Sequence, residues 1–311
     1  MPQDSHGISA VRISNVTKTF GSVTAVNNLS LNIPQGAIYG FIGPNGSGKT
    51  TTMRMIVSIS HPDQGTIHVF NQPGLGPHSG LIGYLPEERG LHRQMEVQAL
   101  LEFHAGLRSG HSMTTEVTEW LEKFGLAHCA SRKLETLSKG MSQKIQFIAA
   151  VLPVPKLLIL DEPFSGLDPV SADVIRAAIL DLRQRGTTII LSTHDMTVAE
   201  NLCDSIFMIY RGNKVLDGTL TAIQNEYGNN TIRVSTAMGI DAVQDLEGVE
   251  AIRDLGQAQE LRMARGCDPQ QVLQTLISRT SVSNFAIVKP SLHDIFVRIA
   301  SPTDKEQEHA A

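Results

Sequence analysis

The sequence predicts an α/β protein in which a parallel α/β core precedes a smaller α+β module. Three apolar stretches at 157–161, 187–193 and 205–210 have the pattern of buried strands, and each is preceded or followed by a helical stretch. A glycine-rich loop at 43–50 lies between a strand pattern and a helix pattern, which is the order of a phosphate-binding loop. The residues after 230 follow a β-α-β-β-α-β order, with the first helix expected at 240–246, and this order is typical of a ferredoxin-like or split-βαβ module.

The N-terminal region is predicted to form an antiparallel layer. Residues 11–20 and 23–33 alternate between apolar and polar side chains, and Gly21 with Ser22 supplies the turn between them. The elements expected next are a buried strand at 37–43, a helix at 51–59, and strands at 65–70 and 81–86. From 95 to 150 the apolar spacing is helical and contains no strand candidate, so we expect a helical insert there.

Composition limits the class of protein. The chain has 311 residues, 41% hydrophobic and 18% charged, which suits one large globular domain plus a smaller one. A net charge of −5 without a long Lys/Arg tract argues against nucleic acid as the main partner. Cys129, Cys203 and Cys267 are far apart and form no CxxC pair, so neither a disulfide framework nor a zinc site is expected. No signal peptide or bilayer-spanning stretch is apparent.

The loop GPNGSGKT has the chemistry of a phosphate-binding loop. Its glycines allow backbone N–H groups to close on phosphate oxygens, Lys49 supplies a positive charge, and the Thr50 hydroxyl can reach Mg²⁺. The helix that follows adds the positive end of its dipole. A chance glycine-rich turn is the alternative, and the order of strand, loop and helix disfavours it. The predicted nucleotide-binding residues of this segment are Gly43, Pro44, Asn45, Gly46, Ser47, Gly48, Lys49, Thr50 and Thr51.

A second motif, LLILDEP, ends with two carboxylates. Four apolar residues predict a strand buried on both faces, and Asp161 and Glu162 follow at its carboxyl end, where ligands bind in open α/β sheets. Asp161 can hold Mg²⁺, directly or through water, and Glu162 can orient or deprotonate a water that attacks the γ-phosphate. A solvated acidic turn is the alternative for this motif taken alone.

A third motif, LSKGM at 137–141, precedes a predicted helix, and by itself Ser138 would be only an N-cap. The order of the three motifs resembles the ATP-binding subunits of ABC transporters over residues 9–225. In that family the segment is usually LSGGQ, so this chain departs from it at the third and fifth positions and keeps Ser138 and Gly140. The resemblance implies that these two residues contact the γ-phosphate of ATP bound to the opposite subunit of a dimer.

Three more positions match the resemblance. Phe20 is at the place of the family's aromatic residue that stacks on adenine, although such a residue alone is more often part of a core. Asp168 ends SGLD, which resembles the loop that crosses the dimer interface, and a plain turn is the alternative. His194 follows a buried strand, at the place of the histidine that senses the γ-phosphate, so we count Glu162, His194 and Lys49 as the catalytic set.

Glu87 departs from the family pattern, which has glutamine at this place. A glutamate is a stronger metal ligand than glutamine but donates no hydrogen bond to the attacking water. Its extra charge beside the γ-phosphate is expected to slow hydrolysis or to couple it differently. We therefore predict a metal site made of Thr50, Asp161 and Glu87. The exchange, followed by Glu88, Arg89 and Gly90, is similar to the subgroup that works with ABC-2 type exporter permeases.

The resemblance implies the fold, an ABC-type P-loop NTPase core with a mixed sheet, an antiparallel β layer and a helical subdomain. It also implies an ATPase that uses ATP and Mg²⁺, pairs with a second ATP-binding subunit, and drives export through a separate ABC-2 type permease. Such a subunit is cytoplasmic and peripheral on the inner face of the cell membrane. A soluble ABC ATPase without a membrane partner and a weakly hydrolysing nucleotide switch are the alternatives.

The predicted domain boundaries follow from the same patterns. We expect an ATP-binding domain at 9–225, with its helical subdomain at about 90–150, and an α+β domain at 226–300. The last stretch, 301–311, is polar and predicted to be disordered. The C-terminal domain has no catalytic constellation, and a packing or dimerisation module is favoured over a ligand sensor.

Overall fold

The chain forms two compact units, residues 1–219 and 220–311. The computed structural model describes residues 9–73, 80–88, 90–227, 231–264 and 266–300. The stretch predicted to be a disordered tail, 301–311, lies outside the described residues. The domain boundary predicted between 225 and 226 lies on the C-terminal side of the division between the units, which falls between 219 and 220.

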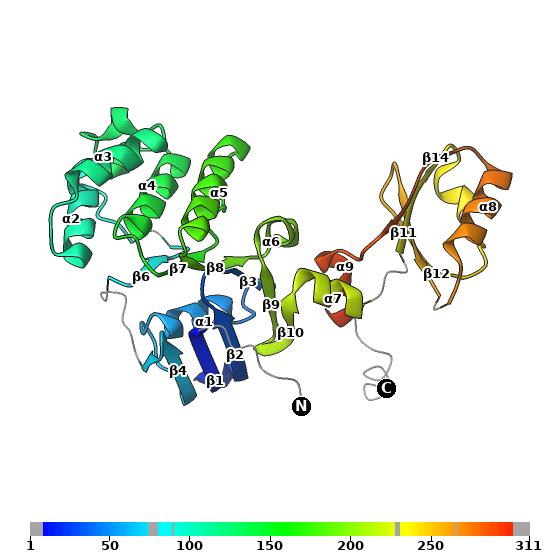
Figure 1. Ribbon diagram of the computed structural model, residues 1–311, viewed down its shortest axis with the longest axis horizontal. Helices are drawn as coiled ribbons and strands as arrows, with labels where there is room; N and C mark the ends of the chain where they lie inside the picture. The colour runs from blue at the N-terminus through cyan, green and yellow to red at the C-terminus, as the bar shows by residue number, and fades with distance from the viewer. Residues whose placement is uncertain (1–8, 74–79, 89, 228–230, 265, 301–311) are drawn as a thin grey trace. The chain divides into compact units, whose positions relative to one another are not determined.

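A six-stranded sheet forms the centre of the larger unit (Figure 1). Its strands in spatial order are β10 (Asn213–Thr219), β9 (Ser205–Tyr210), β3 (Ile38–Ile42), β8 (Thr188–Thr193), β7 (Leu157–Asp161) and β6 (Ile82–Leu85). All neighbours are parallel except β10, which runs antiparallel to β9. Every residue of β3 and β7 is buried, as expected for strands covered on both faces. The carboxyl ends of β3, β7 and β8 therefore lie together at one edge of the sheet.

The predicted antiparallel layer is present. It consists of β1 (Ser9–Phe20), β2 (Val23–Pro34), β4 (Gln64–Val69) and β5 (Gln72–Pro73), in the order β2-β1-β4-β5. Apolar side chains of β1 and β2, such as Ile13 and Val26, share one core cluster with Phe41 and Phe207 of the parallel sheet. The two sheets thus pack on a common apolar core, which fixes the elements that carry the loop 43–50.

Three helices begin at the carboxyl edge of the parallel sheet. They are α1 (Lys49–Ile56) after β3, α5 (Pro169–Gln184) after β7, and α6 (Met196–Leu202) after β8. Helix α1 begins at Lys49, two residues before the predicted start, because the glycine-rich loop itself forms the N-terminus, with Gly48 as N-cap. This edge is the place where open parallel sheets bind ligands.

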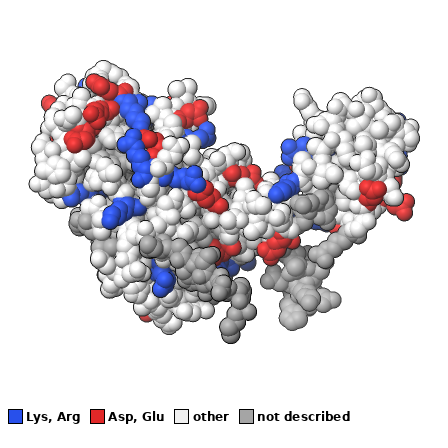
Figure 2. All heavy atoms as spheres, in the orientation of Figure 1, with Lys and Arg blue, Asp and Glu red and all other residues white. Residues whose placement is uncertain are grey.

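The insert predicted to be helical consists of α2 (Val97–Ser109), α3 (Thr114–Lys123) and α4 (Lys139–Val151), with two short 3-10 turns before α4. Its core includes an aromatic cluster, in which the Phe124 and Phe147 rings stack at a centroid distance of 5.6 Å. Trp120 packs on both rings. On the visible face basic side chains gather over α4 and α5 with acidic ones beside them (Figure 2), and Lys123 forms an ion pair with Asp181 of α5.

The smaller unit has the predicted ferredoxin-like strand order. Its antiparallel sheet is β12 (Val249–Asp254), β13 (Gln259–Met263), β11 (Thr231–Thr236) and β14 (Val282–Val288). Helix α8 (Pro269–Arg279) packs on one face, while α7 (Leu220–Glu226) and α9 (Leu292–Ala300) belong to the same unit. The helix predicted at 240–246 is only a 3-10 turn, Gly239–Ala242. A stretch this short cannot sustain an α-helix alone, and Asp245 adopts a left-handed φ of 54°. No described helix has the length and apolar character needed to cross a bilayer.

Candidate nucleotide site

The loop between β3 and α1 has a backbone that only glycine adopts easily. Gly43 has a φ of 148° and Gly48 a φ of 114°. A Cβ atom on Gly43 would lie 2.2 Å from the carbonyl oxygen of Ile209, and one on Gly48 would lie 2.4 Å from that of Ala25. Any side chain at either position would therefore displace backbone as well as strain φ. The loop conformation follows from these two glycines.

Lys49 spans the loop from the first position of α1. Its Nζ donates hydrogen bonds to the carbonyl oxygens of Gly43 (2.7 Å) and Pro44 (3.0 Å). Burial lowers the pKa of Lys49, and nearby carboxylates, of which Glu162 acts most strongly, oppose that shift. Ser47 in the same loop has a buried hydroxyl with no hydrogen-bond partner among the described residues. Such an orphaned group suits a ligand that binds over the loop.

Asp161 is buried at the end of β7. Its Oδ1 accepts a hydrogen bond from Ser192 Oγ of β8 at 2.5 Å, because the two residues are register partners. The same Ser192 Oγ accepts a hydrogen bond from the backbone N–H of Glu162 at 3.0 Å. Asp161 Oδ2 has no partner among the described residues. Ser192 thus holds one oxygen of Asp161, and the other oxygen remains available to a ligand.

Glu162 lies beside His194, at the ends of adjacent strands. Its Oε1 is 2.9 Å from Nδ1 of His194, whose side chain is 59% exposed. Burial raises the pKa of Glu162, while the hydrogen bond to His194 and the charge of Lys49 lower it. Glu162 also has a left-handed φ of 51°, a conformation that non-glycine residues rarely adopt. This backbone and the histidine together fix the direction of the carboxylate.

The loop and the carboxylates line a common cavity of about 310 Å³. It is lined by the loop residues from Asn45 to Thr51 together with Glu87, Asp161 and Glu162. The site residues predicted from separate motifs therefore come together, including Glu87 from the segment after β6. Gly43 and Pro44 do not line the cavity, but their carbonyl groups hold Lys49.

The donors in this cavity fit Mg²⁺. Carboxylate and hydroxyl oxygens are its preferred protein ligands, and the unpartnered Oδ2 of Asp161 is such an oxygen. No group of three His, Cys, Asp or Glu side chains in the described part of the chain is arranged to hold a metal alone. That agrees with the usual mode of Mg²⁺ binding, in which one or two carboxylates act together with substrate phosphates and water.

The remaining predicted residues lie outside the cavity. Ser138 is the N-cap of α4, where its Oγ accepts a hydrogen bond from the Met141 N–H at 3.2 Å. Asp168 is the N-cap of α5, and hydrogen bonds from Ser171 lower the pKa of its carboxyl group. Phe20 is 55% exposed, so it is not a core aromatic.

Lys139, the third residue of LSKGM, lies across the loop 165–168. Its Nζ is 2.6 Å from the place that a Cβ on Gly166 would occupy, and the φ of Gly166 is 68°. A Cβ on Gly140 would be 3.7 Å from Leu167 Cδ2 of the same loop. The segment that begins α4 therefore packs on the loop that begins α5.

Two family models match the chain. The model of the ABC transporter family matches residues 26–165, and that of the C-terminal domain of DrrA1-3-like ATP-binding proteins matches residues 218–300. An uncharacterised ABC transporter ATP-binding protein of Bacillus subtilis, YhaQ, is 38% identical over 287 residues, which cover 92% of this chain and 96% of that protein. The chain belongs to the ABC transporter ATP-binding proteins.

Further similarities agree with this ABC family. The daunorubicin/doxorubicin resistance ATP-binding protein DrrA of Streptomyces peucetius is 31% identical, over 97% of this chain and 96% of that protein. A solved ATP-binding subunit of an ABC transporter superposes with a TM-score of 0.66 and 28% identity, over 70% of this chain and 93% of that chain. The predicted family and fold class are confirmed. ABC ATP-binding proteins hydrolyse ATP, and this chain is an ATPase.

Proposed function

We propose that the chain is the ATPase subunit of an ABC-2 type exporter and works with a separate membrane permease. Support for hydrolysis comes from the common cavity that brings the loop, Asp161, Glu162 and Glu87 together. Support for export comes from the DrrA-like C-terminal domain and from similarity to drug-resistance and Nod factor export proteins. The subunit is then cytoplasmic and peripheral, at the inner face of the membrane.

In this proposal ATP binds along the loop 43–50. Lys49 leaves the carbonyl groups of Gly43 and Pro44 and binds the β- and γ-phosphates, where its charge stabilises the transferring group. Backbone N–H groups at the start of α1 bind the remaining oxygens. Phe20 is 55% exposed, with the Lys18 ammonium group 5.4 Å from its ring centroid, and in this proposal the ring stacks on adenine.

Thr50, Asp161 and Glu87 hold Mg²⁺ in the same proposal. A bound Mg²⁺ supplies positive charge to the phosphate oxygens that become more negative during hydrolysis. Asp161 is prepared for this role because Ser192 fixes Oδ1 and leaves Oδ2 open. Glu87 adds a second carboxylate oxygen donor beside Asp161 and the neutral hydroxyl of Thr50, although its negative charge also opposes that of the phosphate.

Glu162 takes the proton of the attacking water. Its raised pKa makes it a stronger base than an exposed glutamate, while the hydrogen bond to His194 and the charge of Lys49 favour its charged form. His194 orients the carboxylate and senses the γ-phosphate. Ser138 and Gly140 complete the ATP site of a second copy, which places two ATP molecules between two subunits arranged head to tail.

The substitution Glu162→Gln tests the assignment of the base. The amide keeps the size of the side chain but cannot accept the proton, so we expect the steady-state ATPase rate to fall by at least ~100-fold. ATP binding persists, and the variant accumulates as an ATP-bound dimer, which size-exclusion chromatography with light scattering detects. Glu119→Gln, on the exposed surface of α3, serves as the control. Retained turnover in Glu162→Gln refutes the assignment.

A further inference from the structure

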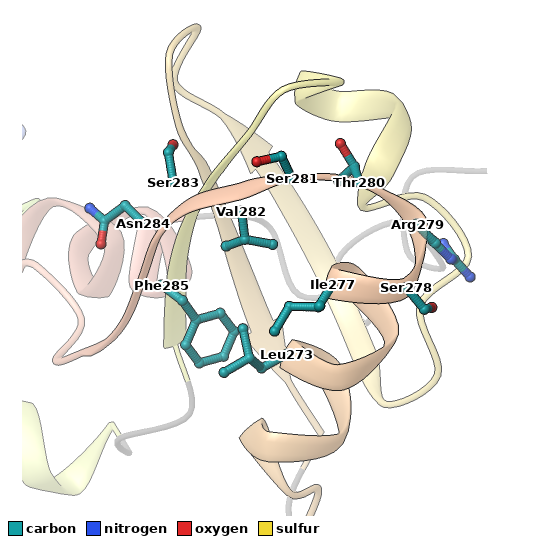
Figure 3. A pocket seen from close by; sticks show the side chains of 10 residues that line it. All are labelled: Leu273, Ile277, Ser278, Arg279, Thr280, Ser281, Val282, Ser283, Asn284 and Phe285. Atoms are coloured by element: carbon teal, nitrogen blue, oxygen red, sulfur yellow. The ribbon is translucent and has the colours of Figure 1, made fainter.

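The C-terminal unit has an open groove beside one edge of its sheet. The groove has a volume of about 640 Å³ and lies between α8 and β14 (Figure 3). The side chains of Leu273, Ile277, Val282 and Phe285 gather in it from the helix and the strand (Figure 3). Ile277 remains 62% exposed. The other lining residues are polar, so the groove has a mixed surface in which four apolar side chains lie next to a strand edge, and this makes it a candidate interaction surface.

The groove offers no charge to a ligand. Among the described residues that line it, Arg279 alone is charged. Its guanidinium donates hydrogen bonds to the carbonyl oxygens of Gln244 (2.8 Å) and Ala242 (3.4 Å), so it is already engaged with the backbone. An occupant of this groove is therefore expected to be an uncharged, partly apolar segment.

The two edges of the sheet differ in charge. The strand order makes β12 and β14 the edge strands. Exposed edges invite pairing with other chains, and charged side chains normally prevent it. β12 carries Glu250, Arg253 and Asp254, whereas β14 carries no charged residue between Val282 and Val288. Only the β12 edge is thus protected by charge.

We propose that β14 pairs antiparallel with β14 of a second copy, so that two C-terminal sheets become one continuous sheet across a two-fold axis. Phe285 and Ile287 are register partners of Val234 and Ile232, which belong to the buried core, so both lie on the face that carries α8. Ile287 is 55% exposed in the single chain. In the proposed register the two copies of Ala286 lie opposite each other. Phe285 then lies across from Ile287 of the partner subunit.

A second copy fits the edge better than the chain's own end does. Residues 301–311 include Asp304, Lys305, Glu306 and Glu308, and burying such charges in an uncharged groove is unfavourable. β14 carries no charged side chain, and its Phe285 and Ile287 both lie on the face that carries α8. A two-fold axis makes the contact self-complementary, as in most homodimers. This interface needs no nucleotide and goes beyond the proposed ATP-dependent dimer.

The full-length chain without nucleotide tests the proposal by sedimentation velocity over a range of concentrations. We expect the wild-type chain to dimerise and Ile287→Lys to raise the dimer Kd by at least ~10-fold, since each introduced ammonium group would lie against the apolar ring of the partner's Phe285. Leu255→Lys is the matched control, because Leu255 is also an exposed apolar residue, 43% accessible, and follows the opposite edge strand. We expect this control to keep the wild-type Kd.

A second variant, with a check of folding, distinguishes loss of the contact from misfolding of the chain. Ile277→Lys changes the groove from the side of α8 rather than from the strand, and circular dichroism with thermal unfolding checks that both variants fold. We expect it to weaken the dimer as Ile287→Lys does. A wild-type chain that stays monomeric, a dimer that survives both variants, or an equal effect of Leu255→Lys overturns the proposal. Monomers that associate only with permease-containing membranes would assign the edge to the permease, and would also overturn it.

The ATP-dependent dimer is measured separately. Ile287→Lys combined with Glu162→Gln is expected to remain monomeric without nucleotide and to dimerise on addition of Mg²⁺ and ATP. Failure to dimerise with ATP would count against the head-to-tail ATP site, whereas a nucleotide-free dimer of the double variant would count against the β14 contact. The samples without nucleotide therefore test the β14 contact, and the samples with Mg²⁺ and ATP test the head-to-tail ATP site.

Discussion

At the scale of single residues, Glu87 shares the cavity with Lys49 and is one of the residues by which this chain departs from the family pattern. Glu87→Gln keeps an oxygen ligand but removes its charge, so we expect the Mg²⁺ concentration for half-maximal ATPase activity to rise by roughly tenfold. The measurement is a Mg²⁺ titration of the ATPase rate at fixed ATP. Glu88→Gln, at the next and also exposed position, is the control. An unchanged Mg²⁺ dependence of Glu87→Gln contradicts the proposed ligand.

His194 controls the protonation of Glu162. Burial raises the pKa of Glu162, and the hydrogen bond from His194 partly reverses that shift. Without the imidazole the pKa of Glu162 rises further, so the base is protonated over a wider range of acidic pH. We expect His194→Ala to move the acidic limb of the kcat–pH profile to higher pH. His128→Ala, an exposed histidine, should leave the profile in place, and an unmoved limb in His194→Ala contradicts this coupling.

The sequence predicted those site residues that belong to contiguous motifs. The loop 43–50, Asp161 and Glu162 are recognisable because their chemistry and their neighbours lie within a few positions. Ser192 was missed, although its hydroxyl contacts both Asp161 and the Glu162 backbone. Its role depends on the register between β7 and β8, which no local pattern gives. A serine at the end of an otherwise apolar strand was the only available signal.

At the scale of elements, the start of α4 has two possible roles, since Ser138 caps the helix and is predicted to contact ATP of a second subunit. Ser138→Asp separates them, because aspartate is as good an N-cap as serine but repels phosphate. We expect the free energy of unfolding to change by less than about 0.5 kcal/mol, whereas ATP-induced dimerisation in the Glu162→Gln background is lost.

Thermal unfolding and light scattering measure the two effects of Ser138→Asp. Ser112→Asp, in the loop before α3, introduces the same charge at an exposed position and serves as the control. Dimerisation that survives Ser138→Asp would leave Ser138 with the capping role alone.

Element types were predictable where the apolar residues formed an unbroken run or alternated regularly with polar ones. The fully buried strands β3 and β7, and the alternating β1 and β2, follow directly from their sequences. The failure at 240–246 has a local cause, because the segment is short and its Asp245 takes a left-handed conformation. Pattern alone cannot show whether so few residues gain enough packing to hold an α-helix.

At the scale of the whole molecule, each unit has its own apolar core. One cluster includes Phe41 and Met53, and the other includes Leu261 and Leu276. We therefore expect two transitions in calorimetric unfolding of the full chain. Mg²⁺ and ATP should raise only the midpoint of the larger unit, by several degrees at saturating ligand, because binding stabilises the unit that holds the site. A single transition, or equal shifts of both midpoints, contradicts independent unfolding.

The left-handed backbone of Glu162 has an evolutionary consequence. A non-glycine residue in this conformation costs about 1 kcal/mol of folding stability, and the buried carboxylate adds to that cost. Selection for stability alone would favour glycine or asparagine at this position. In the proposed function this glutamate serves turnover at a cost in stability, so stabilising substitutions found near β7 should be screened for lost activity.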